Sequence, residues 1–150
     1  MQEGLLMQFR VEAYYRPQHD DKRELLTASA DVDGLIDSLL AGPTQQNLAE
    51  LHSLERSPLP SGTPDHELLV GADHRLQVGV LEFMDASGNW TTAGPKAGRT
   101  EVRYSCVSHV TEFPANSEIP IDLLRRAVKE FCLSGGQRPT CVQWERPKSW

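Results

Sequence analysis

Three side chains that could perform covalent chemistry lie close together in the last third of the chain. Cys106, His109 and Glu112 have the types of a nucleophile, a general base and an orienting acid, as a thiol hydrolase needs. Successive side chains of a strand point to opposite faces, so Cys106 and His109 diverge unless the strand breaks between them. The pattern favours a buried cysteine beside a surface histidine, and a small hydrolase using Cys106 and His109 is the alternative.

Two acid–histidine pairs are the strongest candidates for metal ligands. Asp65 precedes His66 and Asp73 precedes His74, so a hairpin could bring two imidazoles together. The spacing marks no third ligand, and these residue types are also common in turns. The chain has neither the Gly-rich motifs that bind nucleotides nor the H-x-E and P-C-x-x-C motifs of zinc deaminases. We therefore expect no catalytic residue, no metal site and no cofactor.

The cysteine residues and the first residues of the chain favour a reducing compartment such as the cytoplasm. The three cysteines form no C-x-x-C motif, and their odd number argues against a disulfide scaffold. Glu3 stands where a secretion signal would carry Lys or Arg before a longer apolar stretch. Apolar runs stay far below the roughly 20 residues of a membrane span. The sequence predicts a cytoplasmic protein that does not enter a membrane.

The net charge of −6 is distributed unevenly along the chain. Residues 31 to 90 hold ten acidic and two basic residues, whereas residues 91 to 150 hold six acidic and nine basic residues. An acidic surface is often only a solubility device. A block this lopsided also repels nucleic acid and attracts basic proteins. The charge pattern favours a basic protein as the partner and argues against nucleic acid.

The first half of the chain predicts strands around one helix. Residues 5 to 15 alternate between apolar and polar side chains, as a half-buried strand requires. Asp31 is a candidate cap for a helix with an apolar stripe, which Gly42-Pro43 ends. Residues 47 to 55 fit a helix or a strand, and their short length between prolines favours a strand. Residues 17 to 24 and 57 to 64 are expected to be a charged turn and a loop.

Hairpins and a second helix are predicted for the second half. Residues 66 to 70 and 76 to 83 read as paired strands joined by a turn at residues 71 to 74. Residues 85 to 89 form the next predicted turn, with Trp90 opening the returning strand, and a strand at residues 101 to 106 extends this meander. Pro120 begins a helix with Phe131 on its apolar face, Gly135-Gly136 ends it, and residues 140 to 144 form a short strand.

These elements predict an α+β fold. We expect an antiparallel or mixed sheet of about six strands, covered by two helices, in a single domain of residues 1 to 150. The size and the 39% hydrophobic content suit one compact core.

Several stretches resemble the Imm-type immunity proteins of bacterial polymorphic toxin systems, the family paired with nucleic-acid deaminase toxins of the SCP type. They run in family order within residues 31 to 145 and comprise residues 64–71, 79–83, 117–120, 127–131 and 135–144. The resemblance implies an α+β protein that sequesters a toxin, often by covering its catalytic cleft, without catalysis or cofactor of its own. The matched glycines, prolines and apolar positions read as turns, caps and core, so they identify the fold better than the interface.

The resemblance and the charge pattern together predict a cytoplasmic immunity protein that binds a cognate deaminase toxin domain one to one. A non-inhibitory adaptor domain is a further alternative. Loops at hairpins present polar groups well, and Trp90 is either an interface anchor or core. We expect the loop acids to contribute more than the strand acids, because strand side chains alternate. The predicted toxin-binding residues are Asp65, Glu67, Asp73, Glu82, Asp85 and Trp90.

Overall fold

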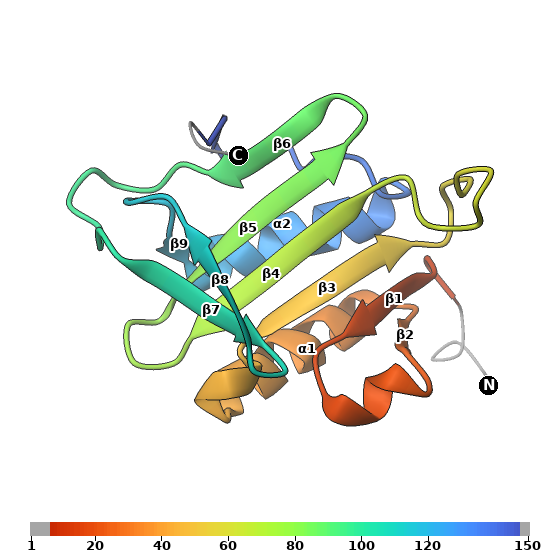
Figure 1. Ribbon diagram of the computed structural model, residues 1–150, viewed down its shortest axis with the longest axis horizontal. Coiled ribbons are helices and arrows are strands. Elements are labelled where there is room, and N and C mark those ends of the chain that lie inside the picture. Colours follow the sequence, from red (N-terminus) through yellow and green to blue (C-terminus); the bar gives the residue numbers. More distant parts are fainter. Residues whose placement is uncertain (1–6, 148–150) are drawn as a thin grey trace.

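A computed structural model, which describes residues 7–147, has the expected α+β architecture. One large antiparallel sheet has helices α1 (Ser29–Ala41) and α2 (Ile121–Leu133) on one face, and a separate two-stranded hairpin lies across the other face (Figure 1). The strands of the hairpin are β7 (Val102–Cys106) and β8 (His109–Phe113). Neither of the helices within the described residues is long and apolar enough to cross a membrane.

The large sheet has eight strands rather than about six. Its path is β10-β6-β5-β4-β3-β1-β2, with β9 beside β5, and each pairing is antiparallel. The additional strands are two or three residues long, too short to show a periodic pattern. The eight strands are β1 (Val11–Tyr14), β2 (Glu24–Leu26), β3 (Leu48–Ser53), β4 (Glu67–Asp73), β5 (Val78–Asp85), β6 (Gly88–Thr92), β9 (Ile119–Pro120) and β10 (Trp144–Glu145).

The helix-covered face of the sheet carries the main core. Alternate residues of the strands, such as Val70 on β4 and Phe83 on β5, pack against the apolar stripes of both helices. Phe131, on the stripe of α2, has no exposed surface, which confirms it as a core residue. The helix ends as predicted, because Gly135 and Gly136 adopt φ angles of 76° and 90°, a region that favours glycine.

A smaller core lies between the other face of the sheet and the β7–β8 hairpin. Leu48, Leu69 and Val80 contact apolar side chains of the hairpin, among them Tyr104. A Cβ atom at Gly71 would lie only 2.7 Å from Cδ2 of Tyr104. The expected turn at residues 71 to 74 is therefore wrong: Gly71 lies within β4 because the hairpin packs closely there, and residues 74–77 form the turn.

Other expectations need correction at element ends. The strand at residues 101 to 106 does not extend the meander, because β7 pairs only with β8. Asp31 lies inside the first turn of α1, where its Oδ2 accepts hydrogen bonds from the backbone N–H groups of Thr27 and Ala28 at 2.8 and 3.1 Å. Trp90 lies in the middle of β6 rather than at its start.

The two ends of the chain also differ from the predicted strands. Of the predicted strand at residues 5 to 15, only residues 11–14 are observed as a strand, β1; residues 7–10 have no regular secondary structure, and residues 1–6 lie outside the described part. The expected charged turn at residues 17 to 24 holds a 3-10 helix (Pro17–Asp20) and the first residue of β2. The final strand begins only at Trp144, because the backbone bends at residues 140–142.

Candidate functional site

The hairpin covers part of its face of the sheet and leaves a remainder (Figure 1), in which the residues nearest the hairpin, such as Leu69, Glu82 and Thr91, are nevertheless buried. We name this remainder the open face, and the strand register arranges its side chains in two adjacent rows. The row beside the hairpin consists of Tyr14, Glu50, Leu69, Glu82, Thr91 and Glu145. The outer row consists of Leu25, Glu12, His52, Glu67, Met84 and Asn89.

The open face is acidic because alternate positions on four neighbouring strands carry glutamate. Burial, together with the nearby Glu67 carboxylate, raises the pKa of Glu82 to about 7. Burial, followed by the same Glu67, also raises the pKa of Glu50. Because these shifts come from desolvation and like charges, the carboxylates lack enough cationic partners within the fold.

The basic side chains near the open face make contacts with other groups. His52 Nε2 is 3.4 Å from Glu67 Oε2, and the Arg23 guanidinium lies 4.6 Å from the centre of the Tyr14 ring. Glu82 has no hydrogen bond or ion pair with any of the described residues, although only 3% of its surface is exposed.

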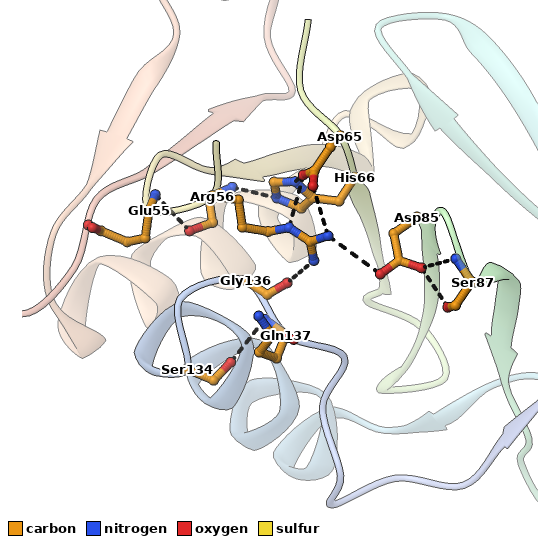
Figure 2. A network of polar contacts seen from close by, with 10 residues as sticks. Glu55, Arg56, Asp65, His66, Asp85, Ser87, Ser134, Gly136 and Gln137 are labelled. Carbon is orange, nitrogen blue, oxygen red and sulfur yellow. Dashed lines mark hydrogen bonds and ion pairs between the residues drawn. The ribbon is translucent and has the colours of Figure 1, made fainter. Parts of the chain in front are cut away.

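Asp65 and Asp85, by contrast, share one arginine. Arg56 donates to both carboxylate oxygens of Asp65, at 2.9 and 3.1 Å, and lies 3.5 Å from Asp85 (Figure 2). Its Nη1 donates to the carbonyl oxygen of Gly136 at the end of α2. The hydrogen bond from Arg56 lowers the pKa of Asp65. This Arg56 network joins the ends of β3, β5 and α2 to the start of β4.

A buried histidine extends the Arg56 network towards the core. His66 Nδ1 lies 3.0 Å from Asp65 Oδ1, and Nε2 accepts a hydrogen bond from the Ser53 backbone N–H at 2.8 Å. This geometry requires the neutral ring with its proton on Nδ1. Burial lowers the pKa of His66 and so favours that form.

Asp73 and Trp90 also contact residues of the chain itself. Asp73 Oδ2 lies 3.2 Å from Arg99 Nη2, and the same guanidinium binds Glu118. Trp90 packs against the helix-side core, and the Arg138 and Arg146 guanidinium groups lie 3.9 and 4.6 Å from its ring centre.

The six predicted toxin-binding residues therefore do not form one surface. The structure brings Glu67 and Glu82 together on the open face, and it places Asp65 and Asp85 in the Arg56 network. The sequence alone does not select Glu50 and His52, because residues 47 to 55, which contain both, fit a helix as well as a strand. Glu50 and His52 can be recognised as candidates once the polar positions of residues 48–53 are aligned in register with β4.

The candidate thiol site has the wrong surroundings for a nucleophile. A turn at residues 107–108 breaks the strand, so Cys106 and His109 become cross-strand neighbours. The thiol is nevertheless buried and donates to the Tyr14 carbonyl oxygen at 3.7 Å. Burial raises the pKa of Cys106 to about 12, whereas a cysteine nucleophile needs a lowered pKa.

The two acid–histidine pairs lie at opposite ends of β4. His66 directly precedes the strand, and His74 directly follows it. The length of β4 thus separates the two imidazoles, and the β4–β5 hairpin does not bring them together. Among residues 7–147, no group of three or more histidine, cysteine or acidic side chains is arranged to hold a metal ion.

The family assignment rests on a match over most of the chain. The family model described as Immunity protein Imm1 matches residues 20–146, which include both helices and seven of the eight strands of the large sheet. The chain belongs to the Imm1 family of immunity proteins. A search of curated protein sequences finds no match to it. Membership of an immunity family implies a cognate toxin as the partner and indicates a binding protein rather than an enzyme.

Proposed function

We propose that this immunity protein binds a nucleic-acid deaminase toxin one to one in the cytoplasm and inhibits it by covering its catalytic cleft. The observation that carries the proposal is the acidic open face, where Glu12, Glu50, Glu67 and Glu82 lie on neighbouring strands. An enzyme that acts on nucleic acid is basic around its substrate channel. Carboxylates held on a rigid sheet can occupy the places of substrate phosphates in such a channel.

The pairing of the acidic residues changes their expected order of importance in toxin binding. Asp65 and Asp85 already compensate Arg56, and Asp73 compensates Arg99. We therefore expect the strand residues Glu67 and Glu82 to contribute more than these three, in contrast to the order expected from the sequence. Trp90 is expected to support β6 from the helix side and to contribute less directly.

The role in immunity requires no chemistry of the protein itself. The protonated, buried Cys106 does not favour the hydrolase alternative. A non-inhibitory adaptor domain that contacts the toxin away from its cleft would leave nucleic acid free to bind. Competition between this protein and nucleic acid for the toxin therefore distinguishes the proposal from the adaptor alternative.

The test is reconstitution with the toxin domain encoded beside this gene. Co-expression is expected to restore host survival, and the two proteins are expected to co-purify. In a deamination assay on single-stranded DNA and RNA, titration of this protein should abolish activity at one equivalent per toxin. Full deaminase activity in the presence of excess protein would refute the inhibition. A neighbouring toxin that cleaves nucleic acid instead of deaminating it would refute only the deaminase assignment.

A further inference from the structure

Glu82 is an uncompensated acidic group at the inner edge of the open face. Only 3% of its surface is exposed, and its carboxylate makes no hydrogen bond or ion pair within residues 7–147. A buried carboxylate that is neither paired nor hydrogen-bonded destabilises the folded state when it ionises. In the free protein the ionised Glu82 carboxylate thus lowers the stability of the fold and makes no compensating contact.

The residue opposite Glu82 has the same deficiency. Thr91 is the register partner of Glu82 on β6, so both side chains lie on the same face of the sheet. The Oγ1 atom of Thr91 is buried and has no hydrogen-bond partner among the described residues. The buried Thr91 hydroxyl and the carboxylate of the almost fully buried Glu82 therefore lie on neighbouring strands, and neither has a partner among the described residues. Such groups are rare in folded proteins, because each costs the free energy of its lost hydration.

The groups around this position add negative charge rather than a counterion. Glu50 lies on the same row, with Leu69 between it and Glu82, and Glu67 lies one row farther out. The nearby basic side chains make contacts with other groups, as His52 does with Glu67. The titratable groups that face Glu82 and its neighbours on this side are Glu12 and Tyr14 on β1, Glu50 and His52 on β3, Glu67 on β4, Glu145 on β10, Cys106 and His109 at the hairpin, and Arg23 before β2.

We propose that Glu82 receives one arginine side chain of the toxin, which enters the open face beside the β7–β8 hairpin. This inference rests on the proposed function and specifies its central contact. A guanidinium group has five N–H donors in a planar fork. It can serve the Glu82 carboxylate and the Thr91 hydroxyl together, while Glu50 and Glu67 add attraction at longer range. Met84, an unbranched and partly exposed neighbour of Glu82 on the same strand, can move to admit it.

Charge complementarity favours this occupant over an apolar one. An apolar group would leave the carboxylate and the hydroxyl unpartnered and would bury them more deeply. An arginine instead removes the uncompensated acid and supplies the missing donors. Binding should therefore stabilise the ionised form of Glu82.

The experiment compares Glu82→Gln with Asp37→Asn in binding to the inactivated toxin domain. Asp37 is an exposed acid of α1 on the opposite side of the sheet, so both variants lose one negative charge. At pH 8 we expect Glu82→Gln to weaken binding by about 30-fold or more, the effect of a central contact, and Asp37→Asn to change it less than about 3-fold. Thr91→Val, which removes only the hydroxyl, should give a smaller loss.

Calorimetry provides a readout that a purely structural role would not change. Near pH 6.5 a large fraction of Glu82 is protonated, so arginine binding should release protons, measured as different binding enthalpies in two buffers of different ionisation enthalpy. Glu82→Gln should reduce this release while remaining folded by circular dichroism. Tight binding by Glu82→Gln, or unchanged proton release, overturns the inference and leaves the proposed function intact. Failure of the wild-type protein to bind the toxin overturns both.

Discussion

The Arg56 network and the open face use the same acidic residue types in opposite ways. In the network, Asp65 and Asp85 share one arginine, and the carbonyl oxygen of Gly136 completes its coordination (Figure 2). On the open face, Glu50, Glu67 and Glu82 lie together, and Glu82 has no cationic partner among the described residues. The first arrangement connects distant segments of the chain, and the second leaves charge available for another protein. An acidic residue is informative about binding only when its internal partners are known.

The largest expected effect is the loss of the Arg56 network. Arg56→Ala should lower the free energy of unfolding by about 3 kcal/mol or more, because it leaves two carboxylates and a carbonyl without their shared donor. The Arg56 side chain is only 16% exposed, so solvent compensates this loss poorly. Urea denaturation at pH 7 measures the change.

Arg10→Ala is the matched control for Arg56→Ala. Arg10 forms a single ion pair with Glu55 at 3.4 Å, and both side chains are largely exposed. Its loss should cost less than about 1 kcal/mol. Equal costs for the two variants would show that the network does not stabilise the fold more than an ordinary surface pair.

Removal of the acid Glu82 from the open face should raise the free energy of unfolding, whereas Arg56→Ala lowers it. Because the pKa of Glu82 is raised to about 7 from 4.5, its contribution is favourable below pH 4.5 and is lost as the pH rises through 7. Glu82→Gln should therefore stabilise the free protein at pH 8, by at most about 3 kcal/mol, and much less at pH 5. Burial of the Gln amide reduces this gain.

Denaturation of Glu82→Gln and wild type at pH 5 and pH 8 tests this prediction. Asp37→Asn again serves as the control, because Asp37 is paired with Arg125 at the surface. A Glu82→Gln variant that is less stable than wild type at pH 8 would mean that the carboxylate is compensated in the free protein after all.

His66 should give the Arg56 network a pH dependence of opposite sign. The pKa of His66 is lowered by burial, so its contribution is present above the ordinary value of 6.5 and is lost as the pH falls. Protonation turns Nε2 into a donor and breaks the hydrogen bond from the Ser53 N–H group, which is worth on the order of 1 kcal/mol. His66→Gln should lower stability at pH 7.5 and flatten its decline towards pH 5. An equally steep decline in His66→Gln would assign the acid sensitivity to other groups.

The smallest effect is expected at the candidate nucleophile. Cys106→Ala removes one buried sulfur atom of the β7–β8 hairpin, with a cost of about 1 kcal/mol, and should leave protection against the toxin unchanged. Host survival during co-expression measures protection, and thermal unfolding shows that the variant folds. Complete loss of protection by a folded Cys106→Ala protein would revive the hydrolase alternative.

Much of the fold follows from local patterns. The apolar stripes of residues 29–41 and 121–133 predict both helices, and alternation predicts most of the longer strands. The sequence places the strand at residues 101 to 106 in the wrong sheet. Alternation shows which side chains share a face, but it does not show which strand is the neighbour. Gly71 was read as a turn residue for a similar reason, since only the position of Tyr104 explains the need for a glycine there.

The sequence by itself determined the α+β class, the excess of acid in residues 31 to 90 and the lack of a recognisable catalytic motif. The tertiary structure alone decided which acids are compensated. Asp65 and Asp85 lie 9 and 29 positions from Arg56 in the sequence, and Asp73 lies 26 positions from Arg99. Ion pairs depend on distance in space, and burial depends on which segment covers a residue. Glu82 is therefore a functional candidate only because the sheet and the β7–β8 hairpin fold around it without supplying a counterion.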